Sequence, residues 1–143
     1  ADVMPFVKKN GMGIMAYGSL AHGLLTGAWT ADTTFGDDDW RRSGANFGIN
    51  SWGPENLSAN VAVVEKLKVI AGDHGKTIPQ LAIAWVLAND AVSVALAGSV
   101  TPAEATENLG GDWEMSDEIS KEIDTLVLSE GSGVGTSGME IAT

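Results

Sequence analysis

The sequence contains no cysteine. Disulfide bonds, thiolate nucleophiles and zinc–thiolate sites are excluded, because each of them needs a cysteine sulfur. A chain without cysteine suits a reducing compartment, and we therefore expect a cytoplasmic protein.

Basic residues are also scarce. Eight lysines and arginines stand against 19 aspartates and glutamates, which gives a net charge of −11, and after Lys76 the only base is Lys121. Nucleic acids and anionic lipid surfaces are held largely by clustered cations. We therefore expect no nucleic-acid partner and no anionic membrane surface as a partner.

Long apolar runs are missing as well. The longest, residues 81–88, falls far short of the roughly 20 residues that a bilayer-spanning helix needs. The N-terminal residues do not show the charged, apolar and small-residue succession of a signal peptide. We expect no membrane association.

The length and composition are those of a globular protein. A chain of 143 residues with 44% hydrophobic and 19% charged residues is typical of one globular domain.

The pattern along the chain alternates between strands and helices. The chain opens at Ala1 in what resembles the end of a helix, with lysines in the last turn and Asn10-Gly11 after it, so we expect the beginning of the protein to be missing. Two short apolar runs predict strands at residues 13–17 and 91–97. The first strand is expected to be buried on both faces. Apolar spacing and capping residues predict four further helices, at residues 58–71, 78–88, 102–109 and 117–128. The capping residues of the last three are Thr77 with Gln80, Thr101, and Ser116.

Two segments show no helical or strand period. Residues 30–55 form a loop that is long for a compact domain, and such loops usually act as lids or binding loops. Residues 129–143 are rich in glycine and serine, and we expect a flexible tail there, with residues 1–128 forming the folded part.

Strands separated by this much helix must pair in parallel, because a tight hairpin cannot join them. The sequence therefore predicts an α/β fold. Two parallel strands cannot cover their own faces, so the chain is interpreted as a piece of a larger α/β barrel or of a doubly wound domain.

Ligands of parallel α/β folds bind at the carboxyl ends of the strands, which here are residues 17–20 and 98–101. The second end leads into a helix start at Thr101-Pro102, which would suit a phosphate, although many strand–helix turns share these features. Tyr17 suits either stacking on a flat cofactor or plugging a barrel, and His22 is a weak acid–base candidate. His74 is interpreted as a helix-terminal surface residue.

A metal site is not predicted. Residues 37–39 are three consecutive aspartates, which lack the alternating spacing of a calcium loop and are interpreted as solvated loop charge.

Four spaced segments together resemble the C-terminal part of an aldo-keto reductase, particularly the bacterial general-stress type. They are the sequence GIMAYGSLAHGLLTG at residues 13–27, Asp39-Trp40-Arg41, the sequence TIPQLAIAWVL at residues 77–87, and Gly98-Ser99 with Glu107-Asn108-Leu109. The resemblance runs from about residue 5 to 128. It implies the last two parallel strands, with their helices, of a (β/α)8 TIM barrel, and an NAD(P)-dependent oxidoreductase that reduces aldehydes or ketones to alcohols.

The resemblance also implies a role for individual positions in binding the cofactor, NADP with NAD as a possibility. It places Tyr17 against the nicotinamide, the loop of residues 18–22 along the pyrophosphate, and the turn of residues 98–100 at the adenosine 2′-phosphate. The helix positions that it places beside the adenine are Glu104, Glu107 and Asn108. The cofactor-binding set is Tyr17, Gly18, Ser19, Leu20, Ala21, His22, Gly98, Ser99, Val100, Glu104, Glu107 and Asn108.

The same resemblance implies no catalytic residue in this chain. The family's Asp, Tyr, Lys and His tetrad lies on earlier strands, before residue 1, so the missing N-terminal part of the barrel would be a partner alongside the small carbonyl substrate. Two alternatives stay open: a noncatalytic nucleotide-binding barrel relative, similar to channel β subunits, and an inactive truncated fragment.

Some positions depart from the family pattern. Ser19, Ala28, Val100 and Glu104 replace the residue types common at these places, and no cation occurs between residues 98 and 108. A 2′-phosphate facing Glu104 and Glu107 would be repelled. We therefore expect weak discrimination between NADPH and NADH, with NADH use a possibility.

Overall fold

The computed structural model describes residues 3–43 and 50–132. Its centre is a pair of parallel strands, β1 (Ile14–Ala16) and β2 (Val92–Ala95), which confirms the predicted pairing. Ile14 pairs with Val92 and Ala16 with Ala95, with an irregularity after Ile14. Both strands are shorter than predicted, because regular pairing covers only the middle of each apolar run.

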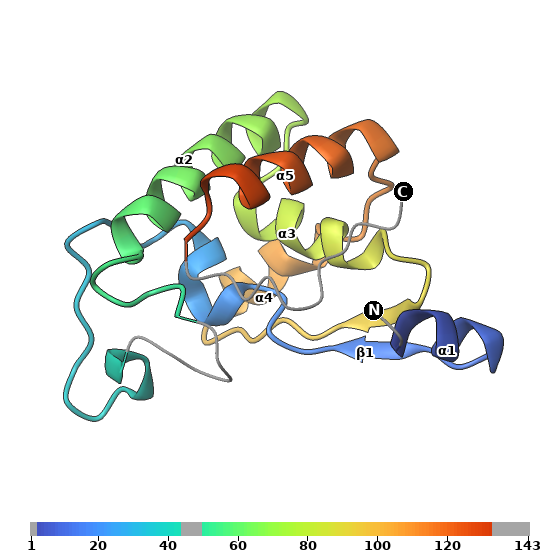
Figure 1. The fold of residues 1–143 in the computed structure, drawn as a ribbon, viewed down its shortest axis with the longest axis horizontal. Helices are drawn as coiled ribbons and strands as arrows, with labels where there is room; N and C mark the ends of the chain where they lie inside the picture. The colour runs from blue at the N-terminus through green and yellow to red at the C-terminus, as the bar shows by residue number, and fades with distance from the viewer. Residues whose placement is uncertain (1–2, 44–49, 133–143) are drawn as a thin grey trace.

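The described part of the chain also contains five α-helices and two short 3-10 helices. Their bounds are α1 (Val3–Lys9), η1 (Ala21–Thr26), η2 (Trp40–Ser43), α2 (Leu57–Asp73), α3 (Ile78–Leu87), α4 (Pro102–Leu109) and α5 (Asp117–Glu130). The helices α2, α3 and α5 lie on one side of the strands (Figure 1). The order agrees with the predicted succession of strand, long loop, two helices, strand and two helices. None of these helices is both long and apolar enough to cross a bilayer.

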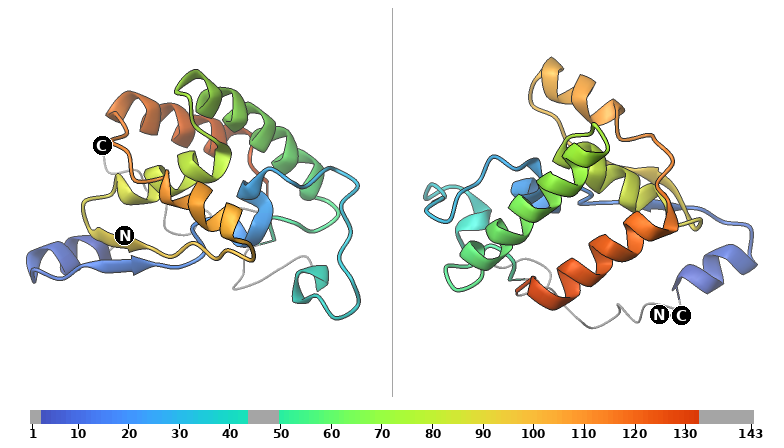
Figure 2. Two further views of the ribbon diagram at one scale, coloured as in Figure 1. Left: turned by 180° about the vertical axis from the view of Figure 1, so that it is seen from behind. Right: turned by 90° about the horizontal axis from the view of Figure 1, so that it is seen from above.

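Helix α3 is the most buried element and lies between the strands and the outer helices (Figures 1 and 2). Its capping box forms as the sequence predicts, with Thr77 as the cap and Gln80 reaching back at 3.1 Å to the Thr77 amide. Leu81 is 1% exposed and packs with Leu67 of α2 and Ile123 of α5. Burial of these apolar groups supplies the main stabilisation of this layer.

The face of the strand pair that carries Met15 is open. Met15 is 64% exposed and Val94 is 41% exposed, whereas Ile14 and Ala16 are partly covered. The prediction of a first strand buried on both faces is therefore wrong for this chain. Among the described residues, the helices form a covering layer on one side only, so side chains that alternate to the other side stay exposed.

The end of α5 is fixed by a polar side chain. Asn60 of α2 is 5% exposed. Its Nδ2 donates hydrogen bonds to the backbone oxygens of Ser51 at 2.5 Å and Ser132 at 2.7 Å. Its Oδ1 accepts a hydrogen bond from the Ser132 amide at 2.8 Å. Helix α5 continues to Glu130, beyond its predicted end at Leu128. The remainder of the predicted tail, residues 133–143, lies outside the described residues, as does Phe47 of the long loop.

Candidate cofactor site

The carboxyl ends of β1 and β2 lie side by side and line one cavity of about 450 Å³. Residues 17–20, 22, 23 and 26 line it from the first strand end, and residues 96–98 line it from the second. The Leu96 amide donates to the Ala16 carbonyl at 2.9 Å, which keeps the two ends together just before the cavity begins. Residues that the sequence places at two separate turns therefore share one site.

The first turn is built from unusual backbone conformations. Gly18 has φ +72°, which suits glycine, but Ala21 and His22 also adopt left-handed values of 46° and 56°. A non-glycine residue in this region costs about 1–3 kcal/mol, and such strain concentrates at functional sites. Hydrogen bonds hold the turn, from the Ala21 amide to the Gly18 carbonyl at 2.8 Å and from the Gly23 amide to the Leu20 carbonyl at 3.0 Å.

This turn separates side chains that face the interior from side chains that stay accessible. Ser19 and Leu20 are only 6% and 9% exposed, and Leu20 packs against Ala82 and Ile83 of α3. Tyr17, in contrast, is 75% exposed at the edge of the cavity, with its ring available to a flat partner. The buried residues anchor the turn, while Tyr17 presents the open aromatic surface.

The His22 imidazole is surrounded by aromatic rings. Its centroid lies 5.7 Å from Tyr17, 5.1 Å from Trp40 and 5.5 Å from Trp52, in tilted or edge-on arrangements that aromatic groups favour. Trp52 is 4% exposed. His22 thereby connects the cavity to the long loop, which supplies both tryptophans.

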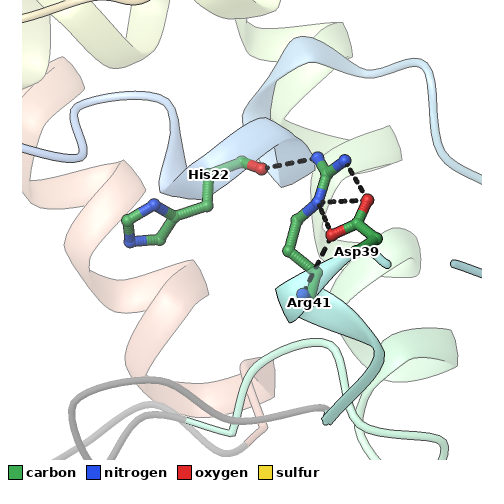
Figure 3. Close-up of polar contacts among 3 residues, drawn as sticks. All are labelled: His22, Asp39 and Arg41. Carbon is green, nitrogen blue, oxygen red and sulfur yellow. Dashed lines mark hydrogen bonds and ion pairs between the residues drawn. The ribbon is translucent and has the colours of Figure 1, made fainter. Parts of the chain in front are cut away.

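Arg41 fixes the long loop to the backbone of the first turn (Figure 3). Its Nη1 donates to the His22 carbonyl at 3.1 Å, on the side away from the imidazole, and its Nε and Nη2 donate to Asp39 at 2.9 and 2.6 Å. The guanidinium also lies over Trp29 at 5.6 Å and Phe35 at 5.0 Å, as cation–π contacts require. One arginine thus organises the part of the loop that approaches His22.

The charges of this pair stabilise each other. Hydrogen bonds from the Arg41 side chain and then from its amide lower the pKa of Asp39, and the hydrogen bond to Asp39 raises the pKa of Arg41. Both groups are therefore ionised at neutral pH. Arg42, in contrast, forms an exposed pair with Asp37.

The second turn, residues 98–101, joins β2 to α4. The Asn108 Nδ2 donates to the Ser99 hydroxyl at 3.0 Å, and the Val100 amide donates to the Glu104 carboxylate at 2.9 Å. Thr101 caps α4 by accepting the Glu104 amide at 3.2 Å. The Val100 side chain is 91% exposed, so the turn presents an open surface next to the cavity.

The predicted site residues fall into two adjoining groups and one outlier. One group, Tyr17, Gly18, Ser19, Leu20, His22 and Gly98, lines the cavity; Ala21 lies within the same turn. The other group, Ser99, Val100, Glu104 and Asn108, is linked by the hydrogen bonds of the second turn. Glu107 differs, because its backbone carbonyl accepts Gln80 Nε2 of α3 at 3.0 Å, a link between helices.

The contact between Arg41 and His22 was not predicted from the sequence. Nothing in the spacing of two residues 19 positions apart indicates such a bond. The segment Asp39-Trp40-Arg41 contributed to the family resemblance, and the expectation attached to it was that the long loop, with Arg41 or Arg42, folds over the dinucleotide; a contact with His22 was not predicted. No group of three His, Asp or Glu side chains within residues 3–43 and 50–132 could hold a metal ion.

Comparison with known proteins identifies the family. Residues 1–127 match the model of the Aldo/keto reductase family. The chain is 35% identical over 128 residues to aldo-keto reductase YhdN of Bacillus subtilis, with 88% of this chain and 37% of that protein covered. It is 31% identical over 122 residues to aldo-keto reductase yakc [NADP(+)] of Schizosaccharomyces pombe, with 85% and 34% covered.

The fold agrees with a solved structure. The glycerol dehydrogenase AKR11B4 from Gluconobacter oxydans superposes with a TM-score of 0.78 at 30% sequence identity, covering 90% of this chain and 38% of that one. The chain therefore spans little more than a third of the length of these relatives. It belongs to the aldo/keto reductase family, and its two parallel strands with their helices are the C-terminal part of that family's (β/α)8 barrel.

Proposed function

We propose that this chain supplies the cofactor-binding part of an NAD(P)-dependent oxidoreductase that reduces aldehydes or ketones to alcohols. The observation that carries the proposal is the single cavity shared by the ends of β1 and β2, with Tyr17 on one side and Gly98 on the other. The similarity to aldo-keto reductase yakc [NADP(+)] supports the choice of cofactor. We also propose a cytoplasmic location, because a chain without cysteine suits a reducing compartment.

The residues present fit a dinucleotide. The exposed Tyr17 ring offers a stacking surface, which suits the nicotinamide. The strained turn of residues 18–22 follows along one wall of the cavity, where we place the pyrophosphate, and the turn of residues 98–100 is placed at the adenosine ribose. When bound, the reduced nicotinamide supplies hydride to the carbonyl carbon of the substrate.

The chain's own residues position the cofactor and take no part in proton transfer in this proposal. Arg41 holds the His22 turn in place, and His22 packs with Trp40 and Trp52 beside the cavity. The proton that completes the alcohol comes from a tetrad residue on strands outside this chain. Those strands would also cover the open face that carries Met15.

Binding and turnover are measured separately on the protein that carries this chain. Titration with NADPH and NADH, followed by dihydronicotinamide fluorescence, is expected to show saturable binding. Loss of dihydronicotinamide absorbance with simple aldehydes and ketones is expected to show turnover. Saturable binding without turnover of any carbonyl compound would favour the noncatalytic nucleotide-binding alternative, and absence of binding would overturn the proposal.

A further inference from the structure

The turn that joins β2 to α4 contains a negatively charged group, the side-chain carboxylate of Glu104. The Glu104 carboxylate folds back over the turn and accepts the Val100 amide at 2.9 Å. The same residue donates its own amide to the Thr101 hydroxyl at 3.2 Å, so two bonds fix the start of α4 and the position of the carboxylate. The Val100 amide, which would otherwise be free to donate to a bound anion, already has an anionic acceptor.

The neighbouring side chains do not offset this charge. No lysine or arginine occurs between Lys76 and Lys121 in the sequence, and Glu107 adds a second carboxylate to the same helix. The other side-chain contact in the turn, between Asn108 and Ser99, joins two neutral groups. The surface next to Gly98 therefore combines hydrogen-bond acceptors with negative charge and has no side-chain cation from its own segment.

We propose that Glu104 is a specificity-determining residue that makes this turn accept a ribose 2′-hydroxyl at least as well as a 2′-phosphate, so that NADH binds about as tightly as NADPH or more tightly. The inference rests on the proposed function, which places the adenosine ribose at residues 98–100. A hydroxyl can donate a hydrogen bond to a carboxylate oxygen. A phosphate dianion has only acceptors at neutral pH, so it meets Glu104 with repulsion and finds the Val100 amide engaged.

Glu104 also has a purely structural role, which the experiment must separate from specificity. A glutamate or a glutamine three residues after a threonine cap serves equally in a capping arrangement. Glu104→Gln therefore retains an oxygen that accepts the Val100 amide while removing the negative charge. If Glu104 acts only by capping α4, this substitution leaves the ratio of the two cofactor affinities unchanged.

The test compares equilibrium dissociation constants of NADH and NADPH for the protein, for Glu104→Gln and for Glu122→Gln. Glu122 is exposed on α5, remote from the turn, and its substitution makes the same change in net charge. The protein itself is expected to bind NADPH no more than about threefold tighter than NADH. Glu104→Gln is expected to shift the affinity ratio toward NADPH by roughly tenfold, whereas Glu122→Gln leaves the ratio unchanged.

Ionic strength gives a second, independent readout. Added salt screens the repulsion between Glu104 and the 2′-phosphate. A higher salt concentration is therefore expected to shift the affinity ratio of the two cofactors toward NADPH in the protein, but much less in Glu104→Gln. A protein that binds NADPH more than 100-fold tighter than NADH would overturn the inference, as would a ratio unaffected by Glu104→Gln. Failure to bind either cofactor would instead overturn the proposed function.

Discussion

Arg41 donates a hydrogen bond to the backbone carbonyl of His22 at 3.1 Å, joining the long loop to a turn that is held in a left-handed conformation (Figure 3). The contact is to the backbone, so it fixes the path of the turn without restricting the imidazole. The aromatic contacts of His22 with Trp40 and Trp52 then lie on the other side of the same residue. His22 therefore connects the long loop to the wall of the cavity, through its backbone on one side and its imidazole on the other.

Arg41→Lys is expected to loosen this coupling. A lysine keeps the charge, but its single ammonium cannot reproduce the paired contacts with Asp39 and reach the His22 carbonyl as well. We expect roughly three- to tenfold weaker binding of the dinucleotide and faster proteolysis within residues 28–43. Arg42→Lys is the matched control, because the Arg42 side chain forms an exposed ion pair with Asp37. Equal effects of both substitutions would contradict the role assigned to Arg41.

The contact between Asp39 and Arg41 is expected to be lost in acid. The pKa of Asp39 in the folded protein lies below its ordinary value of 3.8, chiefly because of the hydrogen bond from the Arg41 side chain. The stabilisation is therefore fully present above pH 3.8 and disappears as the pH falls through the lower, folded value. Fluorescence of Trp29 and Trp40, read as a function of pH, should report this step.

Asp39→Asn should remove that acid step, because an amide has no proton to gain in this range. Asp37→Asn should leave it in place. Retention of the fluorescence change in Asp39→Asn would mean that another carboxyl group controls the loop.

Three glycine substitutions separate backbone strain from steric contact. Gly23 has φ +113°, and an added Cβ would lie 2.9 Å from Trp29 Cζ2, so Gly23→Ala is expected to destabilise by roughly 2 kcal/mol or more. Gly75 has φ +64° with open space around it, so Gly75→Ala should cost only about 1 kcal/mol. Gly72→Ala, within α2 and also in open space, should stabilise by about 0.5–1 kcal/mol.

Chemical denaturation of the three variants measures these differences. If Gly23→Ala is no more destabilising than Gly75→Ala, the contact of the added methyl group with Trp29 has no energetic consequence, contrary to this prediction.

The local signals in the sequence predicted the helices well but not the loop. Thr77 and Gln80 form the capping box at the start of α3, and Thr101 and Ser116 cap the next two helices, as expected. Capping is predictable because it depends on residues only three or four positions apart. The contact between Arg41 and His22 depends on how a long loop folds back. No local rule fixes that arrangement.

The exposure of Met15 shows a different limit. An apolar run predicts a strand covered on both faces, but coverage depends on which other elements are present. In this chain the helices cover one face, and the relatives are nearly three times as long in sequence as the matched region. The pairing of the strands was predictable from connectivity, whereas their burial was not.

The capping box of α3 offers a test of the fold alone. Thr77→Ala removes the side-chain acceptor at the helix start and is expected to destabilise the protein by about 1 kcal/mol, while Thr77→Ser should retain most of the stability. Thermal melts followed by circular dichroism distinguish the two. Similar losses in both variants would assign the effect to the lost methyl group and not to the cap.

The central claim is that the ends of β1 and β2 together bind a dinucleotide, with the open Tyr17 ring against its nicotinamide. The most direct measurement is the titration of the protein, Tyr17→Phe and Tyr17→Ala with NADPH and NADH, followed by dihydronicotinamide fluorescence. We predict that Tyr17→Phe binds nearly as well as the protein itself, while Tyr17→Ala binds roughly three- to tenfold more weakly, because the stacking ring is lost. Equal affinities for all three proteins would contradict the claim.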